Sequence, residues 1–146
     1  MTISQRRKLL LVDDDPAGAE LTVAALSMLD AETKVEVVAD GEEALDYVFR
    51  RGSFAGHPGE LPSAILLDLK MPKIDGHEVL RQIRADARFR DLKVIVLTSS
   101  DQSHDRVRSR ELGSDAYLVK PASIVDLIEL LRGCFVLLAP PDGLTN

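Results

Sequence analysis

The chain is predicted to fold as an α/β domain built around a doubly wound, five-stranded parallel sheet. Five strand-like runs alternate with five segments of helical periodicity, an order that is typical of repeated strand–helix units. Four of the runs, LLLV, AILL, VIVL and AYLV, are apolar without a break, as expected for strands that helices cover on both faces. Right-handed crossovers then give a doubly wound sheet, for which 2-1-3-4-5 is one common strand order.

The elements follow in order along the sequence. The expected strands cover residues 8–12, 34–38, 63–68, 92–98 and 115–119. A first helix begins after Asp15-Pro16, an N-cap followed by proline at the first helical position, and runs to about Leu29. The apolar residues whose spacing carries this helix are Leu21, Ala24, Ala25, Met28 and Leu29.

Four more helices are expected, each after one of the remaining strands. They start after Asp40-Gly41, after the turn at 71–76, at Ser103 and at Ser123. The one at Ser103 is polar and rich in arginine and ends at about Leu112, before the stop residue Gly113. The inward residues are Ala44, Leu45, Val48 and Phe49, then Val79, Leu80 and Ile83, and finally Ile124, Leu127, Ile128 and Leu131.

Composition excludes several classes of function. At 146 residues the chain has room for one domain, and its net charge of −6 gives no general attraction to nucleic acid or to an anionic membrane. A single cysteine, Cys134, excludes an internal disulfide, and three widely spaced histidines do not suggest a zinc site. No apolar stretch is long enough for a membrane span or a signal segment. We therefore expect a cytoplasmic protein that binds neither nucleic acid nor membrane.

Polar residues end four of the strands, and the ends of parallel strands share one rim of the sheet, where ligands bind. The first strand leads into Asp13-Asp14-Asp15 and the third into Asp68. One acid of the three is sufficient as a helix N-cap, which leaves two to converge with Asp68. Clustered carboxylates repel one another and are the ligands of a hard cation, so this rim is a predicted Mg²⁺ site.

Asp68 is the predicted nucleophile, since an exposed carboxylate at a strand end can attack phosphorus and form an aspartyl phosphate. Lys120 would neutralise charge on the transferring group, and the Thr98 hydroxyl would donate a hydrogen bond to it. Taken alone, Thr98 could be only a β-branched strand residue and Lys120 only a solvent-facing one. Their occurrence beside two acidic strand ends favours the phosphoryl site.

The combined motifs resemble the receiver domain of two-component response regulators. They are Asp13-Asp14, Asp68 with Met71-Pro72 and Asp75-Gly76, Thr98-Ser99 and Lys120-Pro121. The likeness covers about residues 8–131 and implies a flavodoxin-like sheet of order 2-1-3-4-5. It also implies one receiver domain over residues 1–146, with a core at about 8–132, an apolar extension at 133–146 and no output domain of its own.

The resemblance also implies roles. Asp68 would accept a phosphoryl group from a sensor histidine kinase, with Thr98 and Lys120 on the phosphoryl oxygens. Mg²⁺ would be bound directly by Asp14 and Asp68, through water by Asp13, and by the backbone carbonyl of Lys70. The peptide bond from Lys120 to Pro121 would be cis. Tyr117 would be the switch aromatic that follows Thr98 inward and changes the face read by a downstream protein; otherwise it is a half-buried strand tyrosine.

Two segments go beyond a plain receiver. The glycine- and proline-rich loop at 52–62 resembles that of stand-alone receivers paired with bacterial phytochrome-type histidine kinases. The last helix and its extension are apolar on several sides, which predicts a homodimer through about residues 124–139; the tail could instead fold back on its own domain. The residues concerned are Val125, Leu130, Phe135, Val136, Leu137 and Leu138.

Two other functions compete with this interpretation. A phosphohydrolase of the haloacid dehalogenase type also uses a strand-end aspartate and Mg²⁺, but it places a second aspartate two residues later, where this chain has Lys70. A pure interaction module that had lost phosphorylation should lack at least one member of a set made of the acid pair Asp13-Asp14 together with Asp68, Thr98 and Lys120. None of these residues is missing. A non-enzymatic phosphoacceptor, with at most self-catalysed phosphotransfer and dephosphorylation, is therefore expected.

Overall fold

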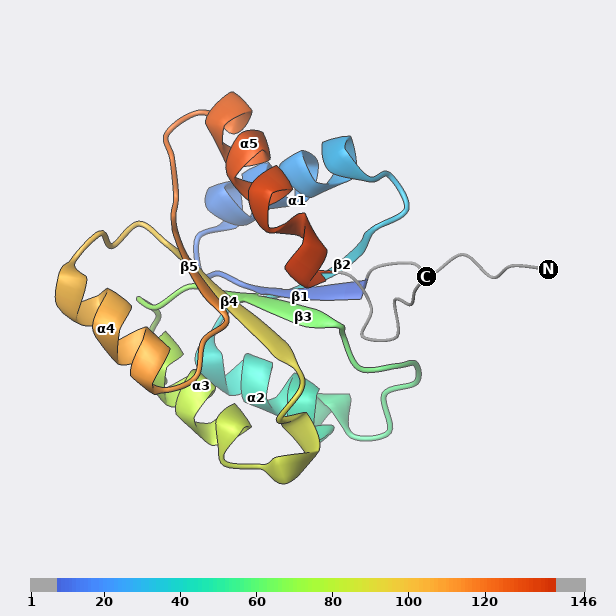
Figure 1. Cartoon of the computed structure of the whole chain (residues 1–146). Helices are drawn as coiled ribbons and strands as arrows, with labels where there is room; N and C mark the ends of the chain where they lie inside the picture. The colour runs from blue at the N-terminus through green and yellow to red at the C-terminus, as the bar shows by residue number, and fades with distance from the viewer. Residues whose placement is uncertain (1–7, 139–146) are drawn as a thin grey trace.

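The computed structural model describes residues 8–138, and within them the predicted sheet is confirmed (Figure 1). All neighbouring strands are parallel, in the order β2-β1-β3-β4-β5. The strands are β1 (Lys8–Val12), β2 (Lys34–Val38), β3 (Ala64–Leu67), β4 (Lys93–Thr98) and β5 (Ala116–Val119). Two have the predicted bounds. The other three are one or two residues shorter than predicted, because β3 excludes Ser63 and Asp68, β4 excludes Leu92 and β5 excludes Asp115.

Helices cover both faces of this sheet. They are α1 (Pro16–Leu29), α2 (Gly41–Phe49), α3 (Gly76–Arg84), α4 (Ser103–Glu111) and α5 (Ile124–Cys134), with 3₁₀ turns η1 (Gly52–Phe54), η2 (Ala87–Phe89) and η3 (Phe135–Leu138). In Figure 1, α1 and α5 lie above the sheet and α2 and α3 below it, while α4 lies at the β5 edge. Asp15, Asp40, Asp75 and Ser123 cap α1, α2, α3 and α5 through their side chains, so each helix begins at its predicted signal.

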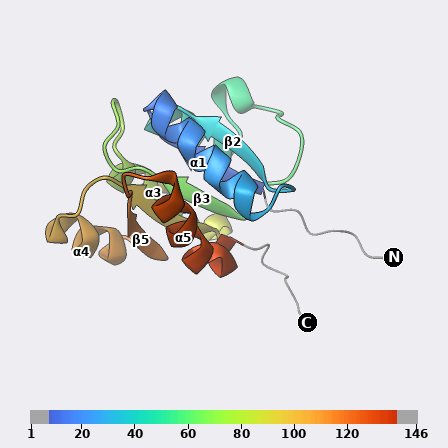
Figure 2. The same ribbon diagram turned by 90° about the horizontal axis from the view of Figure 1, so that it is seen from above.

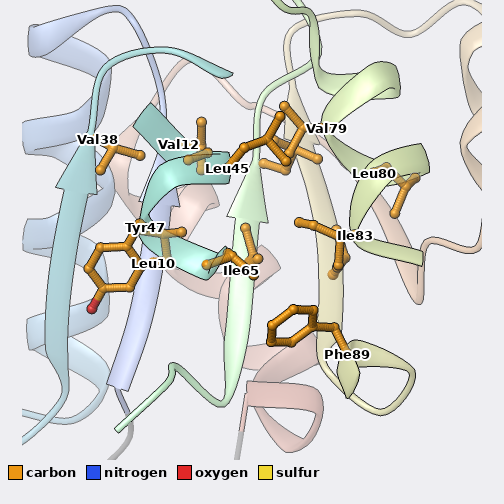
Figure 3. Close-up of a cluster of buried hydrophobic side chains, with 14 residues drawn as sticks. Leu10, Val12, Val38, Leu45, Tyr47, Ile65, Val79, Leu80, Ile83 and Phe89 are labelled. Atoms are coloured by element: carbon orange, nitrogen blue, oxygen red, sulfur yellow. The ribbon is translucent and has the colours of Figure 1, made fainter. Parts of the chain in front are cut away.

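The core between the sheet and α2 and α3 contains the residues that periodicity places there. Val79, Leu80 and Ile83 are fully buried against strand residues such as Leu10 and Ile65 (Figure 3). Tyr47 is also fully buried, although it was not predicted to be. Its ring packs against Phe54 and His57 of the 52–62 loop, with ring centroids 5.0 and 5.4 Å away, so this loop covers the end of α2 instead of extending into solvent.

The apolar residues whose spacing predicted α1 do not all face the core. Leu21 and Met28 are 36% and 69% exposed and Ala24 is also exposed, whereas Thr22 and Leu26 are buried. The reason is that α1 packs against α5 as well as against the sheet, and the two helices lie side by side in Figures 1 and 2. The buried Thr22 hydroxyl is satisfied by donating to the carbonyl of Gly18 at 3.1 Å.

The apolar residues around α5 are divided between core and surface. Leu130, Phe135 and Leu137 pack against the core of their own domain, which is the fold-back arrangement, while Val125 is 66% exposed. The prediction that these residues all need a second chain to cover them is therefore wrong for the three that pack inward. The side chains of Val136 and Leu138 and residues 139–146 lie outside the described part of the chain.

No helix within residues 8–138 has the length and apolar character required to cross a bilayer. The longest, α1, has 14 residues, whereas a span needs about 20.

Candidate functional site

The site is built at the carboxyl ends of β1, β3 and β5. Asp13, Asp68 and Lys120 each follow the last residue of one of these strands. Their backbone N–H groups donate to the last carbonyls of β2, β1 and β4 at 3.1, 3.0 and 2.8 Å. These hydrogen bonds extend the parallel ladders by one residue, so the sheet itself fixes where the three side chains begin.

Three carboxylates converge on this rim, as predicted. Asp13, Asp14 and Asp68 each place one carboxylate oxygen so that all three atoms lie within 4.8 Å of one another. Asp13 and Asp68 are buried and Asp14 is exposed. The third acid of the run, Asp15, is the helix cap, and its Oδ1 accepts from the backbone N–H of Ala17 at 3.3 Å. Because three clustered oxygen ligands suit a hard divalent cation, this donor set fits a metal.

Lys120 lies between two of the acids. Its Nζ donates to Asp13 Oδ2 at 2.8 Å and to Asp68 Oδ2 at 3.2 Å. Burial alone would lower the pKa of Lys120, but the hydrogen bonds and charges of Asp13 and Asp68 together outweigh burial and raise this pKa above its ordinary value. The side chain is therefore an ammonium ion that holds the two buried carboxylates together.

An open cavity of about 350 Å³ leads to Asp68. Asp14, Lys70, Ser99 and Lys120 line it with Asp68, and residues of α1 and α5 form its far wall. The backbone N–H of Lys70 donates to Asp68 Oδ1 at 3.4 Å. A small reactant can thus approach a carboxylate that is itself largely buried. Binding of a metal by the Lys70 carbonyl stays a prediction.

Thr98 is placed differently from the other predicted residues. It is fully buried, and its hydroxyl oxygen accepts from the backbone N–H of Ser100 at 3.4 Å. The hydroxyl of Tyr117 donates to the carbonyl of the same Ser100 at 2.8 Å. The two predicted switch residues therefore meet at Ser100, which the sequence analysis missed. The run of three hydroxyl residues from 98 to 100 is the signal that could have indicated it.

One expectation taken from the resemblance is wrong. The peptide bond between Lys120 and Pro121 is trans, since no peptide bond in the described chain is cis. The trans form is the lower-energy isomer of a bond before proline by about 0.5–1 kcal/mol. In this arrangement the Lys120 backbone still bonds to β4 and its ammonium still reaches both acids.

Comparison with known sequences shows related proteins over most of the chain. The model of the response regulator receiver domain matches residues 9–132. The probable methanogenesis regulatory protein FilR2 of Methanothrix harundinacea is 41% identical over 119 residues, which are 82% of this chain and 75% of FilR2. Response regulator Rcp1 of Synechocystis is 33% identical over 125 residues, covering 86% of this chain and 84% of Rcp1. Other relatives are longer, and the chain spans about half (49%) of response regulator Rre1 of Synechocystis.

Solved structures show the same fold. The phosphorylated cyanobacterial phytochrome response regulator RcpA superposes with a TM-score of 0.83 at 33% identity, covering 91% of this chain and 94% of RcpA. The bacteriophytochrome response regulator RtBRR is 43% identical, with a TM-score of 0.75 and coverage of 86% and 76%. The Mn²⁺-bound form of Rcp1 has a TM-score of 0.81 at 31% identity and covers 95% and 97%. The chain belongs to the response regulator receiver family.

Proposed function

We propose that this receiver accepts a phosphoryl group on Asp68 from a sensor histidine kinase, in a Mg²⁺-dependent reaction, and transmits the change through Thr98 and Tyr117. The observation that carries the proposal is the bridge from Lys120 to Asp13 and Asp68 beside an open cavity. It supplies a nucleophile, a fixed cation and access for a donor in one place. The proposed core of the domain is about residues 8–132, and residues 9–132 match the family.

In the proposed step an oxygen of Asp68 forms a bond to phosphorus, and the bond from phosphorus to the donor's imidazole nitrogen breaks. The imidazole keeps the electron pair of that bond and takes up a proton from water. Lys120 is already 3.2 Å from Asp68 Oδ2, so its charge is in place as negative charge spreads over the phosphoryl oxygens. The hydroxyl of Thr98 would exchange its contact at Ser100 for one with a phosphoryl oxygen.

The metal would be held by Asp14 and Asp68 directly, by Asp13 through water and by the carbonyl of Lys70. When bound, Mg²⁺ supplies positive charge that offsets the acids and the transferring group. Three carboxylate oxygens within 4.8 Å of one another support this assignment, as does the Mn²⁺-bound relative Rcp1. The choice of Mg²⁺ over other hard cations follows from its suitability for phosphoryl transfer.

The proposed donor is a phytochrome-type histidine kinase. Relatives that cover most of this chain, RcpA and RtBRR, are phytochrome and bacteriophytochrome response regulators. Such a kinase draws on ATP and would meet the protein in the cytoplasm, the compartment we propose, where an unpaired cysteine such as Cys134 is ordinary.

The phosphohydrolase alternative loses support. Its general acid would have to be a carboxylic acid two residues after Asp68, and Lys70 occupies that place on the cavity wall. We therefore propose a phosphoacceptor whose own chemistry is limited to phosphotransfer and loss of its own phosphoryl group.

A homodimer through α5 and the residues that follow it remains a prediction. The apolar surface available for it is smaller than predicted, because Phe135 and Leu137 pack inward, but Val125 is 66% exposed on α5. Sedimentation at tens of micromolar concentration checks it: a wild-type protein that is entirely monomeric rejects the dimer, and Val125→Asp should weaken one that forms.

The test of the function uses acetyl phosphate as the donor. We expect the intact mass to increase by one phosphoryl group with MgCl₂ and not with EDTA. Asp14→Ala should reduce the incorporation strongly, whereas Asp126→Ala, an exposed acid on α5, should not. Equal incorporation with and without divalent cation would contradict the metal-dependent reaction.

A further inference from the structure

β2 forms one edge of the sheet, and its outer side is open. Within residues 8–138 the strand pairs only with β1, and it lies on the side of the molecule away from α4 (Figure 2). It contains no proline and no bulge, which are two of the features by which proteins protect a sheet edge. An edge of this kind is a template on which a further strand can pair.

The backbone groups on the open side belong to Val35 and Val37. The N–H and C=O of one strand residue point to the same side, and successive residues alternate between the two sides. The carbonyl of Val38 accepts from the N–H of Asp13, just after β1, at 3.1 Å, so Val35 and Val37 face away from β1. The next outward N–H, that of Ala39, is not open, because it donates to a carboxylate of α2 at 2.8 Å. The open stretch is therefore short and has a defined end.

The side chains of β2 present charge on one face of the sheet and apolar surface on the other. Lys34 and Glu36 share the α2 face with the buried Val38, and neither has an ion pair within residues 8–138. On the α1 face Val37 is 43% exposed and borders a hollow of about 460 Å³, whose other walls are apolar residues of α1 and Glu20. A strand added here would meet an unpaired acid and an unpaired base beside apolar surface.

We propose that β2 pairs with β2 of a second copy of this chain, antiparallel and centred on Val35, so that one sheet continues through both copies. Each Val35 then donates its N–H to the carbonyl of the other Val35, which is the hydrogen-bonded pair of an antiparallel ladder. Lys34 of each copy lies directly opposite Glu36 of the other on the same face, which forms two cross-strand ion pairs. A two-fold axis through the Val35 pair relates the copies, the commonest closed symmetry of a homo-oligomer.

The charges of β2 select both this register and a second copy as the occupant. If the pair were centred on Glu36 or on Lys34, two like charges would lie directly opposite each other, which is destabilising. If it were centred on Val37, Glu36 would lie opposite the apolar Val38. Only Val35 as the centre places each charge opposite its complement, and the sequence of the strand itself supplies both partners. The interface contains no residue of α5, so it is independent of association through that helix.

Amide hydrogen exchange of the wild-type protein, followed by NMR, tests the pairing at the atom concerned. The Val35 amide should exchange on the order of tenfold more slowly as the protein is concentrated from micromolar to millimolar, because its N–H is bonded only in the pair. The Glu36 amide is the internal reference. It faces β1 and should be protected at every concentration.

Charge reversal tests the register by sedimentation equilibrium. Every protein in this series carries Val125→Asp, so that association through α5 is weakened throughout. Adding Glu36→Lys or Lys34→Glu should weaken association about tenfold, whereas both together should recover most of the parent's affinity. The matched control is Asp91→Lys, which reverses an exposed acid away from β2 and should associate like the parent.

Several results would overturn the proposal. Exchange of the Val35 amide that does not depend on concentration, or a parent protein that stays monomeric at millimolar concentration, excludes the second copy. A Val35 amide that is already protected in the monomer means that the chain covers its own edge. Equal association by Glu36→Lys and the parent, or no recovery in Lys34→Glu/Glu36→Lys, contradicts the register.

Discussion

Replacing Lys120 with methionine is expected to destabilise the domain in a way that a divalent cation reverses. The ammonium is the group that neutralises Asp13 and Asp68, at 2.8 and 3.2 Å. Methionine keeps most of the length and apolar stem of the side chain and removes the charge. The two buried acids are then left beside Asp14 with no cation, so the mutual repulsion of the three clustered carboxylates is no longer offset.

The expected size follows from the burial of the pair. Removing one partner of a fully buried ion pair costs about 3–5 kcal/mol. The side chain of Asp13 is 1% exposed, but that of Lys120 is 21% exposed, so solvent screens part of the interaction. We expect the unfolding free energy of Lys120→Met to fall by about 2–3 kcal/mol in metal-free buffer. Millimolar MgCl₂ should stabilise this variant more than wild type, because the ammonium no longer competes for the carboxylates.

Urea denaturation with and without MgCl₂ measures both effects, and Lys73→Met is the matched control. Lys73 also bridges two acids, Asp40 and Glu42, at 3.5 and 3.6 Å, but it is 60% exposed. The control should lose much less stability than Lys120→Met, because solvent screens an exposed ion pair, and it should respond to Mg²⁺ as wild type does. The reasoning is refuted if Lys120→Met loses no more than Lys73→Met, or if Mg²⁺ stabilises all three proteins equally.

Three further predictions concern metal, packing and pH. Millimolar Mg²⁺ should raise the melting temperature of wild type but not of Asp14→Ala, and equal shifts would contradict the metal site. Gly41→Ala would place the new Cβ 2.2 Å from the Ile74 carbonyl oxygen, so thermal unfolding should show a domain that is less stable by about 1–3 kcal/mol. In Gly133→Ala, on α5, the new Cβ would have no neighbouring atom within 4 Å, so this variant should be slightly more stable than wild type. Burial raises the pKa of the Cys134 thiol from its ordinary 9.0 to about 11, so the folded state keeps a proton that the unfolded chain releases. Wild type should therefore lose stability relative to Cys134→Ala as the pH rises from about 9 to about 11 in urea titrations, and parallel pH profiles would contradict the raised pKa.

The strands were predictable because buried parallel strands need unbroken apolar runs and stop where a polar residue appears. It was less predictable which face of each helix would be buried. In α3 the inward residues alternate with charged ones, and Val79 and Ile83 are buried as predicted. α1 carries apolar residues on more than one side, so its own sequence does not determine which of them will meet α5, and Met28 is exposed in consequence.

The clustering of Asp13, Asp14, Asp68 and Lys120 was predictable from topology alone, since the ends of neighbouring parallel strands must share a rim. The role of Ser100 could not be predicted from topology. Its contacts depend on the path of the loop after β4, which tertiary packing determines and no periodicity encodes. The inward packing around α5 was undecided for a similar reason, because an apolar segment fits its own core or a second chain equally well.

The most direct test of the central claim is to locate the phosphoryl group. Wild type treated with acetyl phosphate and MgCl₂ is reduced with borohydride, which converts an aspartyl phosphate to homoserine, and its peptides are then mapped by mass spectrometry. We predict a single modified position, residue 68, and no modification in Asp68→Asn, which keeps the shape of the side chain and removes the nucleophile. Modification at another residue of wild type, or undiminished incorporation by Asp68→Asn, would contradict the proposal that Asp68 is the acceptor.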